Sequence, residues 1–224
     1  MPDNQFHDAS RAQLSMLAAV EKRVLIWLAQ RTPAWINPDH LTALGLLSLI
    51  GAGLGYWYAS RDKAGLLVVI ACLVLNWLGD SLDGTLARVR NRQRPRYGFY
   101  VDHVIDALGT TCLLGGLALS GYMNDRLALA LLIAYFLLSI EVYLATYTIG
   151  TFHLSFWKFS PTELRIVLSI GNLAAYLDPG VVAGGGSYRA FDIGGWIAAV
   201  VMAGVLFTAI ARHTLYLYRL ERIK

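Results

Sequence analysis

Six strongly apolar runs alternate with short polar segments along the chain. A helix needs about 20 apolar residues to cross the hydrocarbon core of a bilayer, and every run except the fifth reaches that length. The pattern predicts six membrane-spanning helices, over approximately residues 39–60, 64–90, 98–121, 126–149, 161–177 and 192–219. The fifth is short and ends at Asp178-Pro179, which precedes a glycine-rich loop at 184–186. We therefore expect an all-α integral membrane protein.

The segment ahead of the first run is amphipathic. Its apolar side chains recur at helical spacing on one face: Leu17, Val20, Val24, Trp27 and Leu28. Glu21 and the two basic residues after it fall on other faces. Residues 1–36 are thus predicted to include a helix lying in the membrane interface, with an amphipathic cap packed on the protein as the alternative. The prolines that follow break this helix, and Asp39 is the predicted N-cap of the first span.

The composition supports a membrane protein without a separate soluble domain. Hydrophobic residues make up 56% of the 224 residues and charged residues only 15%. Because there is no internal repeat or linker, residues 1–224 are predicted to form a single membrane-embedded domain. The net charge is +4, but the basic residues flank apolar runs, so we expect anionic lipid headgroups as partners and no nucleic acid.

The basic residues also predict an orientation. Fifteen of the nineteen Lys and Arg residues lie in the N-terminal segment, in 88–96, in 158–165 or at the C-terminal end. The other four lie in the opposite connections: Arg61, Lys63, Arg126 and Arg189. Because cytoplasmic loops are enriched in Lys and Arg, both termini and the aspartate-rich end are expected to face the cytoplasm. The protein is expected in the cell membrane or, in a bacterium, in the inner membrane.

Four acidic residues interrupt the apolar pattern between the second and third runs. The stretch GDSLDGTLARVRNRQRPRYGFYVDHVID, residues 79–106, contains Asp80, Asp83, Asp102 and Asp106. A carboxylate within a membrane span costs roughly 2.5–3.5 kcal/mol even on lenient insertion scales, so these acids need a compensating partner. Each pair is spaced to lie on one helical face, and a short loop makes the two helices antiparallel. An all-oxygen site of four carboxylates suits two Mg²⁺ or Mn²⁺ ions, which typically also bind substrate phosphates.

Small and basic residues surround the acids at fixed places. Gly84 removes a side chain where a phosphate would approach, and Ala87 keeps the next turn small. Arg88 is one turn beyond Gly84 and offers a planar donor fork to a phosphate. Gly98, four residues before Asp102, is expected to allow a close approach of helices at the start of the third span. Together these residues favour a diphosphate site.

These residues resemble the signature of the CDP-alcohol phosphotransferase family, DxxDGxxAR followed by GxxxDxxxD. All eight signature positions are present: Asp80, Asp83, Gly84, Ala87, Arg88, Gly98, Asp102 and Asp106. The resemblance implies a six-span membrane enzyme with an N-terminal interfacial helix, commonly a homodimer. Such an enzyme moves a substituted phosphate group from a CDP-linked alcohol to an acceptor alcohol and releases CMP. One of the two substrates is a lipid, so a role in phospholipid biosynthesis is expected.

The resemblance also implies roles for individual residues. The four aspartates would hold two metal ions, with Asp106 also the general base. Gly84, Ala87, Arg88 and Gly98 would line the nucleotide and its diphosphate. An acceptor hydroxyl would then attack the β-phosphorus while CMP leaves.

Two sets of residues point to different substrate branches. His103 directly follows the third aspartate and, with the intramembrane Glu141, is similar to the choline and ethanolamine phosphotransferases, where either residue would be catalytic. In this interpretation Glu141 is a partner of His103 or a base toward a lipid hydroxyl. The alternatives are a hydrogen bond of Glu141 to Tyr or Thr within the bundle and a hydrogen bond of His103 to a metal-bound aspartate. A basic set instead favours a CDP-diacylglycerol donor and a phosphate-bearing acceptor: Lys158, Arg165, Arg212 and His213. The sequence leaves this choice open.

Two functions outside the family also place acids in a membrane. A cation transporter or channel would use the four aspartates as an ion path, although Arg88 beside such a path would repel the ion. A lipid-binding protein that kept only the fold would have no need for the complete set of acids. An enzyme therefore accounts best for the sequence.

Overall fold

The computed structural model describes residues 18–149, 161–178, 181–183 and 186–222, and it contains seven helices and one short hairpin within them. In chain order the elements are α1 (Ala18–Arg31), α2 (Pro38–Ala59), α3 (Ala64–Val89), α4 (Pro95–Leu119), α5 (Asp125–Ile149), α6 (Pro161–Leu177), β1 (Val181–Ala183), β2 (Gly186–Tyr188) and α7 (Ala190–Leu220). Helices α2 to α7 match the six predicted runs, with bounds that differ by no more than three residues.

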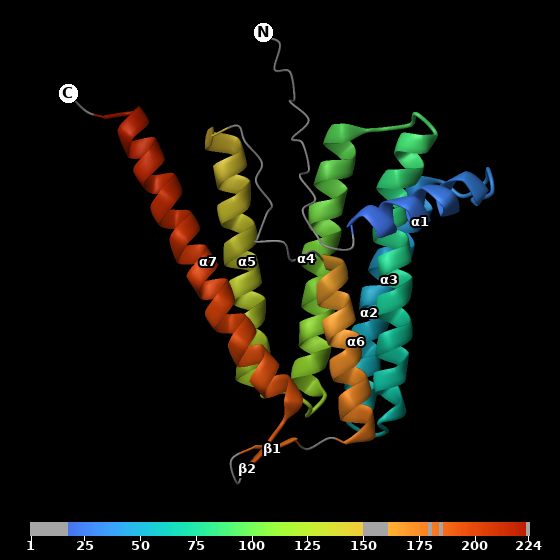
Figure 1. Cartoon of the computed structure of the whole chain (residues 1–224), viewed down its shortest axis with the longest axis vertical. Helices are drawn as coiled ribbons and strands as arrows, with labels where there is room; N and C mark the ends of the chain where they lie inside the picture. The colour runs from blue at the N-terminus through green and yellow to red at the C-terminus, as the bar shows by residue number, and fades with distance from the viewer. Residues whose placement is uncertain (1–17, 150–160, 179–180, 184–185, 223–224) are drawn as a thin grey trace.

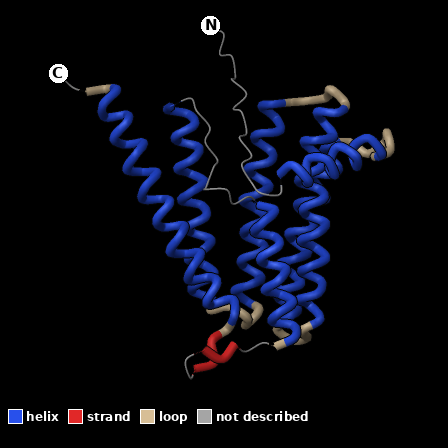
Figure 2. The backbone as a smooth tube through the Cα atoms, viewed as in Figure 1, coloured by secondary structure: helices blue, strands red, loops and turns tan. Residues whose placement is uncertain are grey.

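The long helices run alongside one another, and α1 lies across them at one end (Figure 1). The connection between α3 and α4 and the C-terminal end of α7 lie at that same end. The hairpin lies at the opposite end, where β1 pairs antiparallel with β2 (Figure 2). The sequence predicted only a loop there, so the strand at Gly186–Tyr188 is a correction. Residues 184–185 lie outside the described residues.

Four of the described helices are long and apolar enough to cross a membrane: α2, α3, α5 and α7. Their length and composition agree with an integral membrane protein. Helix α4 carries Asp102 and Asp106, and α6 has only 17 residues and carries Glu163 and Arg165. Their charges and, for α6, its length set these two helices apart from the other four.

Glycines allow α2 to pack closely against α3 and α4. A Cβ atom at Gly116 of α4 would overlap the backbone of Gly53 in α2, and one at Gly53 would overlap the carbonyl of Cys112. At the other crossing, a Cβ at Gly79 of α3 would lie 2.6 Å from the carbonyl oxygen of Leu41. Such small residues let helix backbones approach within a membrane. Helix α2 is therefore held between the two helices that carry the aspartates.

Helix α1 presents two different apolar surfaces. Leu25 and Ala29 are buried in a cluster with Leu82 and Leu86 of α3, so one face packs on the protein. Two residues of the predicted interfacial face, Val24 and Trp27, are 41% and 52% exposed. Leu17 and the side chain of Val20 lie outside the described residues. The helix thus both packs on the bundle and keeps apolar side chains exposed.

The start of α2 differs from the prediction. The N-cap is Asn37, whose backbone N–H donates to His40 Nδ1 at 3.2 Å, and Pro38 is the first helical residue. Proline is favoured there because the first helical N–H groups have no partner within the helix. The carboxylate of Asp39, predicted as the N-cap, instead forms an ion pair with Arg94. This ion pair connects α2 to the segment between α3 and α4.

Candidate active site

The four aspartates line one cavity between α2, α3 and α4. Asp80 and Asp83 come from α3 and Asp102 and Asp106 from α4, as the antiparallel arrangement of these helices predicts. The remaining lining residues are Thr42, Gly45, Asn76 and Ile105. Gly45 belongs to the close crossing of α2 and α3, where a Cβ at Gly79 would lie 2.7 Å from its backbone nitrogen. The glycine packing therefore brings α2 to the wall of this cavity.

A cation from α6 already contacts the first aspartate. Arg165 Nη2 lies 2.6 Å from Asp80 Oδ2, and Arg165 Nε donates to Asn76 Oδ1 at 2.8 Å. The Arg165 side chain is only 15% exposed. Asn76 in turn donates from Nδ2 to the carbonyl oxygen of Gly45 at 3.0 Å. This chain of hydrogen bonds links α6, α3 and α2, and it explains how Arg165 is tolerated within an apolar helix.

The second aspartate is held by neutral donors. Thr42 Oγ1 of α2 donates to Asp83 Oδ2 at 2.6 Å, and the backbone N–H of Gly84 contacts Asp83 Oδ1. Asp102 and Asp106 line the same cavity from α4. Their carboxylates also have interactions of their own.

The donor set of the cavity fits a divalent cation. Among the described residues, no three His, Cys, Asp or Glu side chains lie close enough, as they stand, to hold a metal ion. The cavity nevertheless brings together four carboxylates with a hydroxyl and an amide oxygen, the ligands that Mg²⁺ and Mn²⁺ prefer. Asp80 moreover binds a positive charge, the guanidinium of Arg165. The chemistry of the lining residues therefore fits a divalent cation.

Of the residues predicted to contact a diphosphate, Gly84 and Arg88 lie as expected, whereas Gly98 does not. A Cβ at Gly84 would lie 3.7 Å from Arg88 Nη1, so the Arg88 side chain does reach back over this glycine. Arg88 also donates to Thr85 Oγ1 at 3.2 Å. Gly98 differs from the prediction, because a Cβ there would meet no atom of the described residues within 4 Å, so none of the described helices approaches it closely. Ala87 follows on the same helix and is partly exposed.

His103 lies among aromatic side chains near the aspartates of α4. Its Nδ1 is 2.6 Å from the carbonyl oxygen of Phe99, so Nδ1 carries a proton and donates to that oxygen. The imidazole ring packs on Phe99 at a centroid distance of 4.1 Å and edge-on to Tyr143 of α5 at 5.0 Å. These contacts fix the orientation of the ring.

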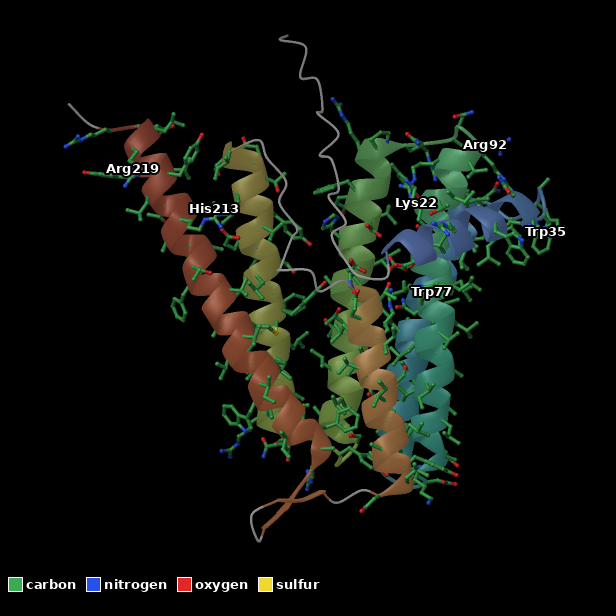
Figure 3. The ribbon with its side chains drawn as sticks, viewed as in Figure 1. Lys22, Trp35, Trp77, Arg92, His213 and Arg219 are labelled. Atoms are coloured by element: carbon green, nitrogen blue, oxygen red, sulfur yellow. The ribbon has the colours of Figure 1, made fainter. Side chains whose placement is uncertain are left out.

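Glu141 of α5 binds a different histidine from the one expected. Its Oε1 lies 2.5 Å from Nδ1 of His213, which is labelled on α7 in Figure 3. His103 instead packs on Tyr143. The expectation that Glu141 partners His103 is therefore wrong. Residues two apart on a helix point to nearly opposite faces, so Tyr143 faces α4 while Glu141 faces α7. The spacing of residues along α5 could not predict that the Glu141 face meets α7 and the Tyr143 face meets α4.

The expected basic pocket is also not assembled as predicted. Arg165 reaches the aspartates, but His213 pairs with Glu141 and Arg212 is exposed on α7. Lys158 lies outside the described residues. Of the described members of this set, Arg165 is the one that contacts an aspartate of the cavity.

Three residues that hold the site together were not predicted from the sequence. Thr42 and Asn76 bind directly to Asp83 and Arg165, and Glu21 of α1 accepts hydrogen bonds from α3 and α6. Asn76 and Asp80 are four apart on α3, a spacing that was available as a signal in the sequence. Thr42 and Glu21 offered no such signal, because their partners are distant in sequence.

The fold and the cavity define a helical membrane protein with an acidic site at a three-helix junction. Residues 35–211 match the sequence model of the CDP-alcohol phosphatidyltransferase family, and the chain belongs to this family. The resemblance found in the sequence is thereby confirmed.

The chain is similar in sequence to two named proteins. The chain is 28% identical over 104 residues to archaetidylinositol phosphate synthase of Pyrococcus horikoshii, which covers 46% of this chain and 52% of that protein. It is 28% identical over 173 residues to human cholinephosphotransferase 1, covering 73% of this chain and 42% of that protein. The chain thus spans about half the length, or less, of these curated relatives.

The fold is similar to that of solved structures. Phosphatidylinositol phosphate synthase of Mycobacterium tuberculosis, with CDP-DAG bound, has a TM-score of 0.62 at 19% identity, over 87% of this chain and 94% of that chain. A second structure of that enzyme, with manganese and citrate, has a TM-score of 0.62 at 22% identity, over 86% and 88% of the two chains. At these identities the likeness establishes the fold.

Proposed function

We propose that this protein is a phospholipid-biosynthetic transferase that moves a substituted phosphate group from a CDP-linked alcohol to an acceptor alcohol and releases CMP. The observation that carries the proposal is the convergence of Asp80, Asp83, Asp102 and Asp106 on one cavity in a chain of this family. The geometry also supports it, because Arg88 extends over Gly84 at the edge of the same motif.

The chain's own residues account for each part of the transfer. The acceptor hydroxyl attacks the β-phosphorus of the donor, an O–P bond forms, and the bond from that phosphorus to the bridging oxygen breaks. Asp106 takes the proton of the hydroxyl as it attacks. Arg88 stabilises the negative charge that CMP carries away, and Gly84 leaves space for the diphosphate. Ala87 and Gly98 add no bulk along the path of the nucleotide.

The carboxylates of Asp80, Asp83, Asp102 and Asp106 would hold two divalent cations, Mg²⁺ or Mn²⁺. When bound, such ions neutralise the charge of the diphosphate and of the leaving group. Thr42 keeps Asp83 oriented through its hydroxyl, and Asn76 keeps Arg165 beside Asp80. These contacts hold the carboxylates of Asp83 and Asp80 in orientations from which they would bind the cations.

For the substrates, we favour a CDP-diacylglycerol type of donor and an acceptor that carries its own phosphate. Arg165 places a guanidinium group beside the aspartates, where it can bind such a phosphate through two parallel hydrogen bonds. The relative that makes archaetidylinositol phosphate and the solved structure with CDP-DAG bound agree with this choice. The membrane then supplies the donor laterally.

A CDP-choline or CDP-ethanolamine donor with a lipid alcohol is the second candidate. It is favoured by the relative named cholinephosphotransferase and by His103, whose ring is oriented beside the aspartates of α4 by its contacts with Phe99 and Tyr143. In this case His103 and Glu141 would be catalytic. Wild-type rates in both His103→Ala and Glu141→Gln would remove the support for this candidate.

We further propose the arrangement of the whole chain in the membrane. Helices α4 and α6 would span with α2, α3, α5 and α7, giving six spans in a single domain of residues 1–224. Helix α1 would lie in the interface through its exposed Val24 and Trp27. The termini and the aspartates would face the cytoplasm, and the protein would act as a homodimer. Proteolysis of inside-out vesicles tests the cytoplasmic orientation, and chemical cross-linking tests the homodimer.

The decisive experiment measures CMP release by the purified full-length chain in lipid vesicles with Mg²⁺ or Mn²⁺. CDP-diacylglycerol, CDP-choline and CDP-ethanolamine are offered separately, the first with glycerol phosphate, inositol phosphate or serine and the others with diacylglycerol. We expect CMP with CDP-diacylglycerol and a phosphate-bearing acceptor. CMP from the other donors alone would move the assignment to the second candidate, and no CMP from any pair would contradict the proposed function.

A further inference from the structure

A carboxylate of α1 lies where α1, α3 and α6 meet. Glu21 Oε1 accepts hydrogen bonds from Trp77 Nε1 at 2.8 Å and from Ser81 Oγ at 3.4 Å, both on α3. The same oxygen accepts a hydrogen bond from Thr162 Oγ1 of α6 at 2.8 Å. Trp77 lies at the place where α1 crosses the bundle (Figure 3). One oxygen atom therefore connects three helices.

The hydrogen bonds of Glu21 lie next to the aspartate cavity but not in it. Trp77 is three residues before Asp80, and Thr162 is three residues before Arg165, so each partner of Glu21 is a neighbour of one member of the Asp80–Arg165 ion pair on its own helix. Glu21 itself does not line the cavity of the aspartates. Its hydrogen bonds thus set the spacing between α3 and α6 one helical turn from the ion pair.

The other end of α6 is held separately. Asn172 Nδ2 donates to the hydroxyl of Tyr56 in α2 at 2.9 Å, in the interior of the bundle. Lys63 Nζ donates to the carbonyl oxygen of Tyr176 at 3.4 Å, close to the end of α6. Because these contacts remain when Glu21 is changed, α6 stays folded against the bundle while its first turn is released.

We propose that Glu21 is a positioning residue that holds the first turn of α6 against α3 and thereby places the Arg165 guanidinium for the phosphate of the acceptor. This inference rests on the proposed function for its effect on turnover. The hydrogen-bonding role needs an acceptor oxygen at this position and no negative charge, since all three donors are neutral side chains. Glutamine keeps such an oxygen and alanine removes it.

The kinetic test compares Glu21→Ala, Glu21→Gln and the control Lys22→Ala, which changes an exposed neighbour on α1. CMP release is measured with CDP-diacylglycerol and the phosphate-bearing acceptor that the wild type uses. We expect Glu21→Ala to raise the acceptor KM about tenfold, with kcat and the donor KM within about twofold of wild type. Glu21→Gln should stay within about threefold of wild type, as should Lys22→Ala. A fall in kcat with unchanged acceptor KM would contradict the proposal.

A second measurement does not depend on turnover. The rate at which phenylglyoxal modifies Arg165 is followed by mass spectrometry, with Arg88 as the internal reference. We expect Glu21→Ala to speed modification of Arg165 at least about threefold, because a released α6 opens the ion pair. Glu21→Gln and Lys22→Ala should leave it near the wild-type rate. Equal modification in Glu21→Ala and wild type would refute the positioning role, whereas a wild type that releases no CMP would refute the proposed function alone.

Discussion

The bundle has a packed half, formed by α2, α3 and α4, and a sparse half, formed by α5 and α7, which differ in how much of their surface is buried. In the most apolar stretch of α2, 44% of the residues are buried, and in that of α3 39%, but in that of α7 the share is 6%. All four aspartates lie on α3 and α4, which α2 holds together through its glycine crossings. Helix α7 instead leans away from the bundle toward its C-terminal end (Figure 1). Chemistry that needs fixed distances is thus built into the packed half.

The sparse half has a polar contact of a different kind. Glu141 of α5 and His213 of α7 hydrogen-bond each other, with side chains 13% and 34% exposed. This contact connects two helices whose outer surfaces are exposed and apolar, as expected of surfaces that face lipid. The comparison suggests that substitutions in the packed half affect catalysis, whereas substitutions at the contact between α5 and α7 affect mainly stability.

The largest effect is expected for Asp106→Asn in the packed half. The amide cannot accept the proton of the acceptor hydroxyl, so CMP release should fall about a thousandfold. Binding of the CDP-alcohol, measured by isothermal titration calorimetry with Mn²⁺ present, should remain measurable. If binding is lost together with turnover, Asp106 acts chiefly as a metal ligand.

Arg165→Gln is expected to have the next largest effect. Loss of the guanidinium removes a charged hydrogen-bond donor, and the KM for a phosphate-bearing acceptor should rise about ten- to hundredfold. Arg212→Gln is the matched control, because Arg212 is exposed on α7 and should leave this KM near the wild-type value. Similar changes in both variants would indicate a general effect of net charge on the membrane surface.

The glycine crossing is tested by Gly116→Ala. Its added methyl group would overlap the backbone of Gly53, so we expect a loss of roughly 1–3 kcal/mol in stability and a lower melting temperature in detergent. A Cβ at the neighbouring Gly115 of α4 would meet no atom of the described residues within 4 Å, so Gly115→Ala should be neutral or slightly stabilising. Equal melting temperatures for the two variants would show that the crossing is not tightly packed.

The smallest effect on turnover is expected in the sparse half. Glu141→Gln keeps an oxygen toward His213 and should change CMP release from CDP-diacylglycerol by less than about threefold, with a modest loss of thermal stability. Differential scanning fluorimetry and the CMP assay measure the two quantities on one preparation. A large loss of turnover without destabilisation would instead favour a catalytic role for Glu141.

Much of this architecture was predictable because it depends on local patterns. The apolar runs predicted helices α2 to α7 with bounds close to those observed, since length and hydropathy are properties of each segment alone. The spacing of the aspartates predicted two facing pairs, and the short loop between α3 and α4 predicted that they converge. The N-cap at Asn37 was missed because Pro38 and Asp39 both suit the start of a helix.

The errors concern the relations between helices that are distant in sequence. Glu141 was expected to be a partner of His103 or a base toward a lipid hydroxyl, but the rotation of α5 about its axis directs its side chain toward His213. Gly98 was expected at a helix crossing, yet the described close crossings involve other glycines, among them Gly53, Gly79 and Gly116. A sequence pattern gives the faces of a helix but not the neighbour that each face meets.

The sequence by itself determined the class of protein, the acidic motif and the family, because hydropathy and short spacings express local geometry. Only the tertiary structure decided which side chains support the aspartates. Thr42 of α2 binds Asp83, and Arg165 of α6 binds Asp80 and Asn76, while Glu21 of α1 binds α6 one turn away through Thr162. Their contacts depend on helix rotation and crossing distance, which are set by the packing of the whole bundle.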